Sequence, residues 1–247
     1  MKEYNYMEEL IKLVDLSQNR PLNDIVYEGL RSAIIKGVIP VGERINEKVY
    51  ADYMNISRTP IRNAITRLSD EGIIEYIPNY GVVVKRVTVD DAVEIYKIRV
   101  ALDTLASVSA MQLMTDKQYQ AMDDLLTQTE EAEARGEVSY VIQLFSDFND
   151  MIYSYARMPR LSVMVSKLRD YLVRFRDISL NGDSRRKKAL EEHRIIYRCM
   201  MNKDEEQMRL VIAEHLNYYN SYIMKQLLER EAEIERKALE NADESAG

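Results

Sequence analysis

The sequence predicts a mainly α-helical protein built from two differently organised parts. Helix breakers are scarce, with 8 Gly and 5 Pro among 247 residues, and 46% of the residues are apolar. Most breakers lie in the first third of the chain, whereas from residue 82 to 240 only Gly136, Pro159 and Gly182 remain. Long helices joined by short turns are therefore expected after residue 82, and a smaller mixed domain before it.

Length and composition exclude several classes of protein. A chain of this length has enough apolar residues for one large core or two ordinary ones. Its single cysteine, Cys199, cannot form an internal disulfide, which favours a reducing compartment, so a cytoplasmic protein is expected. Residues 1–19 lack the pattern of a signal peptide. No apolar run reaches the roughly 18 residues of a membrane span, so no membrane partner is expected.

The first part of the chain shows the pattern of three helices and a β-hairpin. Apolar residues at helical spacing, a favourable N-cap at Ser57 and a terminating glycine at Gly72 define the helices. The expected helices are Leu22–Lys36, Glu47–Met54 and the segment from Ser57 to Gly72. Two β-type runs follow around a Pro-Asn-Tyr-Gly turn, at Ile73–Ile77 and Val82–Lys85. This order is that of a winged helix-turn-helix with a small β-hairpin wing.

The rest of the chain predicts an all-α antiparallel helical bundle. Thr88 and Asp91 resemble a capping box that opens the first of its helices. Six helices with short connections are expected, at 88–114, 116–135, 139–156, 159–180, 183–201 and 204 to about 237. The predicted domains are an N-terminal extension at 1–20, the winged helix-turn-helix at 21–86, the helical domain at 88–230 and a polar, frayed tail at 231–247.

Charge is divided in the same way. Residues 20–86 carry ten basic and eight acidic side chains, whereas residues 87–247 carry 22 basic and 29 acidic ones. The whole chain has a formal net charge of −7. A basic region on an acidic protein favours one surface that faces a polyanion such as DNA.

The third helix carries the main candidate contacts to DNA. Arg58 and Arg62 lie four residues apart, opposite the apolar stripe that contains Ile61, and arginine can donate two hydrogen bonds to guanine in a major groove. The other candidates would hold phosphates or lie over the adjacent groove; they are Lys48, Ser57, Thr59, Asn79 and Tyr80. The alternative from the residues alone is an ordinary solvated helix with surface arginines.

Four runs of the first part resemble the DNA-binding domain of GntR-family transcription regulators in order, spacing and residue identity. They are Val26–Gly37, Pro40–Glu47, Ser57–Leu68 and Glu71–Ile74. The resemblance implies that Arg58 and Arg62 are the two recognition-helix arginines and that Gly81 is the wing-tip glycine. It also places Lys48 where the family usually has an arginine, and lysine keeps the charge but loses the bidentate fork.

Three residues of the second part are candidates for a ligand site. His193 and His215 are the only histidines of the chain, and each lies on an apolar helical stripe. Facing the bundle interior, they could ligate a metal such as zinc or bind an anionic ligand. Arg99 lies on a similar face and needs an anionic ligand or a carboxylate partner such as Asp103. The alternative is a purely structural role for all three.

The second part is also similar to the FCD ligand-binding domain of the fatty-acid-responsive branch of GntR regulators. The matching runs are Ile98–Asp103, Glu192-His193 and Glu214-His215. Members commonly bind a divalent metal such as zinc or nickel through one Asp and three His. Here Phe145 and Asn149 stand where the Asp and the first His are expected, so a weak or absent metal is predicted. The resemblance still implies a pocket in which Arg99, Asn149, His193 and His215 face an effector, plausibly a carboxylate.

These observations favour a transcription regulator that binds double-stranded DNA. Two recognition helices placed one helical turn apart on a palindromic operator require a homodimer, and a small carboxylate effector would modulate its affinity for DNA. Two alternatives remain open. One is a DNA-binding dimer without an effector; the other is a metal-dependent enzyme that uses the two histidines, although no nucleophile constellation or phosphate-binding loop accompanies them. No catalytic residue is therefore assigned.

Overall fold

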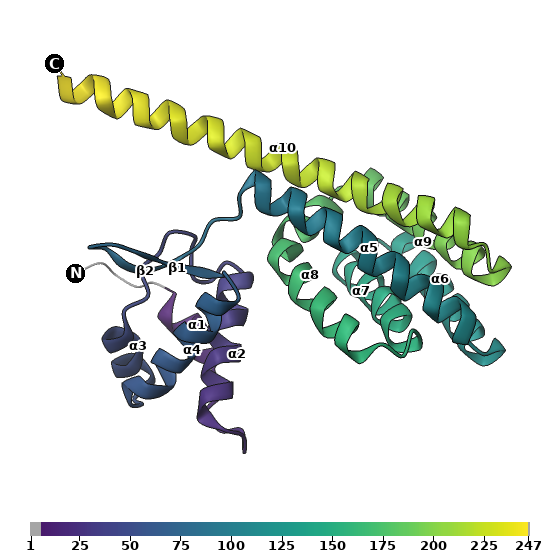
Figure 1. Cartoon of the computed structure of the whole chain (residues 1–247), viewed down its shortest axis with the longest axis horizontal. Helices are drawn as coiled ribbons and strands as arrows, with labels where there is room; N and C mark the ends of the chain where they lie inside the picture. Colours follow the sequence, from purple (N-terminus) through teal and green to yellow (C-terminus); the bar gives the residue numbers. More distant parts are fainter. Residues whose placement is uncertain (1–5, 247) are drawn as a thin grey trace. The chain divides into compact units, whose positions relative to one another are not determined.

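The computed structural model describes residues 6–246, without the side chains of 174–179, 219, 230, 234, 235 and 237–246. The chain divides after Val87 into two compact units, each with its own core (Figure 1). The expected fold class is confirmed, because the chain is mainly helical and its described part contains one two-stranded hairpin. Among the described residues, no helix combines the length and the apolar character needed to cross a membrane.

The first unit contains the three helices and the hairpin within one or two residues of their predicted bounds. They are α2 (Leu22–Ile35), α3 (Glu47–Met54), α4 (Arg58–Asp70), β1 (Ile74–Ile77) and β2 (Gly81–Val84). Helix α4 packs on α2 and α3. Gly72 follows the helix with a positive φ of 73°, the left-handed conformation expected after a helix C-cap. The two strands are antiparallel, with Ile74 opposite Val84.

A helix that was not predicted, α1 (Met7–Leu13), also belongs to the first unit and packs on α2. Leu10 and Val14 are buried, with 0% and 3% exposure. Their spacing of four residues is helical, so the signal was present in the sequence. The close packing depends on Gly29, because a Cβ atom there would collide with Cγ2 of Val14 and lie 3.1 Å from the carbonyl oxygen of Leu13.

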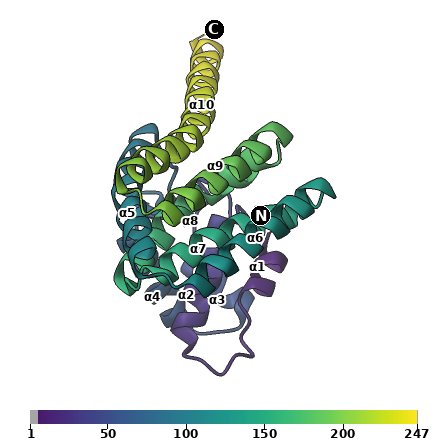
Figure 2. The ribbon, with the colours of Figure 1, turned by 90° about the vertical axis from the view of Figure 1, so that its right-hand side faces the viewer.

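The second unit is a bundle of six helices in its described part. They are α5 (Val89–Leu113), α6 (Asp116–Ala134), α7 (Val138–Tyr155), α8 (Pro159–Leu180), α9 (Asp183–Asn202) and α10 (Glu205–Ala246). The predicted capping box is confirmed, since the Thr88 side chain accepts from the Asp91 backbone and Asp91 accepts from Thr88. Helix α5 runs antiparallel to α10 (Figure 1), and α6 lies beside α7 and α9 (Figure 2).

The end of the last helix differs from the prediction. Helix α10 continues to Ala246, whereas the predicted helix ends near Lys237 and is followed by a frayed tail. The final residues are rich in Ala and Glu, which have high helix propensity, and they contain no Pro or Gly before Gly247. Their polarity was therefore a poor indicator of where the helix ends.

Candidate nucleic-acid interface and ligand pocket

Helix α4 separates an apolar face from a polar one. Its buried residues are Pro60, Ile61, Ala64, Ile65 and Leu68. Arg58, Thr59 and Arg62 are exposed on the other side of the helix, as the spacing predicts. Ser57 occupies the N-cap position with an extended backbone, but its side chain makes no capping hydrogen bond in the structure.

Arg62 is held by a neighbouring helix of the same unit. Its Nη2 atom lies 3.0 Å from Oε2 of Glu47, the first residue of α3, and its Nε atom faces the same carboxylate. The Arg62 side chain remains 66% exposed. The pair fixes the direction of a guanidinium group that still faces solvent, and the spacing of fifteen residues between Glu47 and Arg62 gives no signal of it in the sequence.

Arg67 belongs to the internal structure of the unit. It pairs with Asp24 at 2.7 Å, and its guanidinium lies over the Tyr27 ring at 3.6 Å from the centroid. The Tyr27 hydroxyl in turn donates to Glu71, and burial with that bond raises the pKa of Tyr27 to about 12. The third arginine of this helix therefore ties α4 to α2.

Lys48 lies beside Glu47 in α3 and is exposed. Its backbone N–H donates to the side chain of Asn46, which caps the helix at 3.0 Å. This cap fixes the start of α3. The hydrogen bond from Lys48 to Asn46 therefore sets the position of Lys48 and also that of Glu47, which pairs with Arg62.

The tip of the wing carries the remaining candidates. Asn79 and Gly81 both have positive φ angles, of 64° and 109°. Tyr80 between them is 44% exposed, and the guanidinium of Arg44 lies 5.8 Å from its ring centroid. The positive φ of Gly81 favours glycine, and a Cβ there would also lie 3.2 Å from Nε of Arg44, so that the arginine side chain would have to shift. Arg44 was not singled out from the sequence; a bridge from Arg44 to Val83 places it beside the wing.

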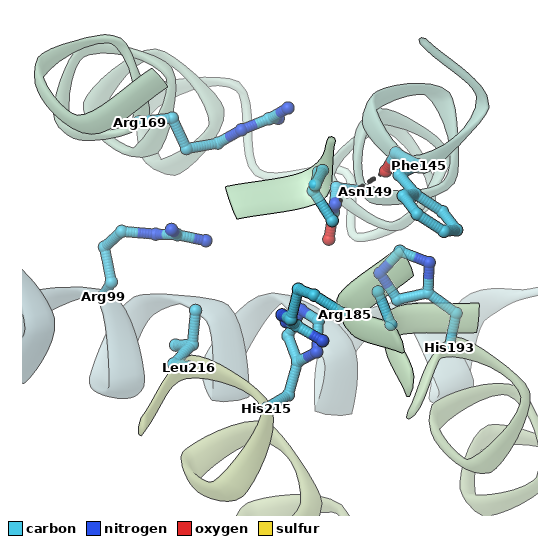
Figure 3. Close-up of a pocket in the computed structure, with 10 residues that line it drawn as sticks. Arg99, Phe145, Asn149, Arg169, Arg185, His193, His215 and Leu216 are labelled. Carbon is cyan, nitrogen blue, oxygen red and sulfur yellow. Dashed lines mark hydrogen bonds between the residues drawn. The ribbon is translucent and has the colours of Figure 1, made fainter. Parts of the chain in front are cut away.

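The second unit contains a cavity of about 60 Å³ between α5, α7, α8, α9 and α10 (Figure 3). All four predicted ligand residues line it, and six further residues complete its described wall. The lining residues are Arg99, Phe145, Asn149, Arg169, Leu180, Arg185, Ala189, His193, His215 and Leu216. The structure thus brings the predicted residues together from four helices.

Arg99 makes the pair that the spacing suggested. Its Nη2 atom lies 2.6 Å from Oδ2 of Asp103, one turn later in α5. The hydroxyl of Tyr153 donates to the other oxygen of Asp103 at 3.0 Å. Burial, with the charge of Asp103, raises the pKa of Tyr153, which stays a neutral donor. Asp103 is therefore fixed behind the guanidinium of Arg99.

At the other end of the cavity, the carboxylate of Glu192 contacts both His215 and Arg185. Oε2 of Glu192 lies 2.7 Å from Nδ1 of His215 and 3.2 Å from Nη1 of Arg185. Burial of Glu192 raises its pKa, but the hydrogen bond from His215 and the charge of Arg185 outweigh it and lower the pKa overall. Glu192 is an anion in the native protein, and Arg185 also lies over the Tyr218 ring at 4.5 Å.

His193 is packed between aromatic rings. It stacks on Phe148 with centroids 4.5 Å apart and meets Phe145 edge-on at 4.9 Å, while the His215 ring lies 5.1 Å away. Burial, with the charges of His215 and Arg185, lowers the pKa of His193 well below its usual value, so the ring is neutral. Its Nδ1 atom is buried and has no hydrogen-bond partner among the described residues.

The donors around the histidines do not fit a divalent metal. Phe145 supplies no ligand, and the amide nitrogen of Asn149 donates to the Phe145 carbonyl at 2.8 Å. Glu192 is already bound by His215 and Arg185. Within residues 6–246, where side chains are described, no three His, Cys, Asp or Glu are grouped to hold an ion. Two imidazoles without an anionic ligand bind zinc or nickel poorly.

Two cationic residues of the cavity were missed by the sequence analysis. Arg169 reaches it from α8 and pairs with Asp150 at 2.6 Å, and Arg185 reaches it from the start of α9. Both positions follow from how the helices pack, and no motif marks them. Their buried side chains, 15% and 9% exposed, are the structural signal that sets them apart from surface arginines.

Two family models match the chain. Residues 22–84 match the bacterial regulatory proteins of the gntR family, and residues 94–218 match the FCD domain. The HTH-type transcriptional regulator YdhC of Bacillus subtilis (strain 168) is 28% identical over 78% of this chain and 86% of its own length. The HTH-type transcriptional repressor RspR of Escherichia coli (strain K12) is 23% identical over 81% and 88%. The structure of E. coli McbR/YncC shares the fold, with a TM-score of 0.66, 23% identity and coverage of 84% and 98%.

Proposed function

The chain belongs to the GntR family of bacterial regulatory proteins and carries an FCD domain, and from this premise we propose that it binds a palindromic operator as a homodimer under the control of a small carboxylate effector. Its domains and relatives are those of a transcription regulator with a helix-turn-helix DNA-binding domain and not of an enzyme.

The observation that carries the DNA-binding part is the exposed basic face of α4. Arg58 and Arg62 would read base edges, with Ser57, Thr59 and Lys48 on phosphates. Asn79, Tyr80 and Gly81 at the wing tip would lie on the adjacent groove or backbone. A dimer would place two such helices about one helical turn apart, so the operator would be an inverted repeat.

The cavity of the second unit supports an effector over a purely dimerising role. A pocket that had lost its ligand would be expected to fill with side chains, whereas this one retains about 60 Å³ lined by Arg99, Asn149, His193 and His215. Cationic and neutral donors favour a carboxylate there. Its binding would change the population of conformations that bind DNA.

Selection of duplexes from a random DNA pool with the full-length protein tests this function. An enriched inverted repeat with half-sites about one helical turn apart is expected, together with a dimer mass by light scattering. The matched control is the double variant Arg58→Ala with Arg62→Ala, which should enrich no sequence. A monomer, or enrichment of a single asymmetric site by the wild type, would contradict the proposal.

A further inference from the structure

Basic side chains line the ligand cavity of the second unit at two places (Figure 3). Arg99 and Arg169 extend into it from α5 and α8 on one side. Arg185 and His215 approach from α9 and α10 on another side, next to His193. None of the described lining residues is an acid, so a ligand meets guanidinium groups without a competing carboxylate in the wall.

The acids that balance these cations stand outside the described lining. Asp103 and Glu192 are buried partners of Arg99 and Arg185, but Glu192 is shared with His215. The partner of Arg169 is Asp150, whose side chain is 64% exposed and therefore weakly held in water. Among these guanidinium groups, Arg169 is therefore the one whose acid partner is exposed and not buried.

Apart from the basic residues, Asn149 and His193, the described lining of the cavity is apolar. Phe145, Leu180, Ala189 and Leu216 supply the apolar surface. His193, which is 2% exposed, adds an Nδ1 atom that lacks a hydrogen-bond partner among the described residues. A buried polar atom without a partner is costly, and a ligand that reaches it would remove that cost.

We propose that this pocket binds a compact dicarboxylate whose two ends are held by arginine side chains in place of a metal ion. The inference rests on the proposed function, because it concerns the same effector site. One carboxylate would lie against Arg99 and Arg169, and the other against Arg185 and His215, with a short methylene chain on the apolar wall. Guanidinium groups bind carboxylates in a bidentate manner, which replaces the charge that a divalent cation would supply.

The size of the cavity limits the ligand. A volume of about 60 Å³ is several times the roughly 10–15 Å³ of this measure that one water needs, so the cavity can admit part of a small organic acid. A diacid with a chain of four or five carbons is the expected class, and a long fatty acid is too large for a cavity of this volume.

Calorimetric titration of the full-length protein after treatment with a chelator tests the inference. Succinate or glutarate should bind with one site per chain, and butyrate should bind at least 10-fold more weakly because it leaves one end unpaired. Stronger binding of butyrate or of inorganic phosphate than of both diacids would overturn the inference, as would no binding of either diacid.

Substitution of Arg169 distinguishes a direct contact with the diacid from a general loss of stability. Arg169→Gln should weaken diacid binding at least 10-fold while the melting temperature stays close to that of the wild type. Arg160→Gln, an exposed position of the same helix, is the matched control and should leave binding unchanged. Equal diacid affinity of Arg169→Gln and the wild type would contradict the assignment.

Native mass spectrometry tests whether the pocket holds a metal ion, because it measures the number of ions bound per chain. The wild type should carry no stoichiometric zinc or nickel, whereas the double variant Phe145→Asp with Asn149→His should gain one zinc per chain. A stoichiometric metal in the wild type, needed for diacid binding, would overturn the inference.

The inference and the proposed function fail in different ways. A diacid that binds the pocket but leaves operator affinity unchanged would support the pocket assignment and contradict effector control. An uncharged effector that shifts operator affinity, and whose binding Leu216→Trp blocks, would support the function and overturn the diacid assignment.

Discussion

Arg62 of the recognition helix is hydrogen-bonded to Glu47 of the preceding helix, with Nη2 and Oε2 3.0 Å apart. An arginine that reads a base edge must be aimed before it meets DNA, and this pair limits its rotamers. The same carboxylate is repelled by phosphates. In the proposed DNA complex, Glu47 would therefore affect both the direction of Arg62 and the cost of approaching the duplex.

Replacing Arg62 by Ala should weaken operator binding about 10-fold to 100-fold and relax the base preference at one position of each half-site. Lys48→Ala should instead weaken binding to all sequences alike and reduce the salt slope by about one unit. Fluorescence anisotropy at several salt concentrations, on the selected operator and on single-base variants, distinguishes the two. Wild-type binding by both variants would show that this surface does not contact DNA.

Glu47→Gln should raise affinity for non-specific DNA and lower the ratio of specific to non-specific affinity. It removes a negative charge that DNA repels, and it weakens the bond that aims Arg62. The measurement is anisotropy on the operator and on a scrambled duplex of equal length. Glu43→Gln, a partly exposed acid outside this pair, serves as the control, and an unchanged ratio in Glu47→Gln would argue against a positioning role.

Gly29→Ala should destabilise the first unit although alanine favours helices. The new methyl group would collide with Val14, and overpacking of this kind costs about 1–3 kcal/mol. Combining it with Val14→Ala removes the colliding atom, so the double variant should lose less stability than the sum of the single variants. Urea denaturation gives the free energies of unfolding, and strict additivity would mean that α1 moves away freely.

The second unit should lose stability as the pH falls from 7.5 to 5. Native His193 has a lowered pKa and stays neutral, because it is buried and faces His215 and Arg185, with Glu192 nearby. In the unfolded chain the imidazole titrates near its ordinary value of about 6.5. Below that pH the unfolded state takes up a proton that the native state does not, which favours unfolding.

His193→Gln removes this titration. Its free energy of unfolding should therefore fall less steeply over the same pH range, as measured by denaturant titration at each pH. Part of the slope will remain in the variant, because the lowered pKa of Glu192 acts in the same direction at more acidic pH. Identical slopes for wild type and variant would show that the pKa of His193 is the same in the native and the unfolded protein, contrary to its lowered native pKa.

Local signals in the sequence determined the helices, the hairpin and several contacts. Three of these features are local. The capping box joins Thr88 to Asp91, the ion pair joins Arg99 to Asp103, and a glycine directly follows the end of α4. Because each involves residues at most four positions apart, spacing alone predicts them. The candidate residues for DNA and effector also follow from spacing and family resemblance. Their roles in binding remain predictions.

The tertiary structure decided which distant side chains meet. Arg169 and Arg185 enter the same cavity as Arg99 from different helices, and Glu47 reaches Arg62 across fifteen residues. Such contacts depend on helix crossing and on the reach of long side chains, which no periodicity encodes. The sequence by itself therefore determined the elements and their faces, whereas packing determined the cationic lining of the pocket.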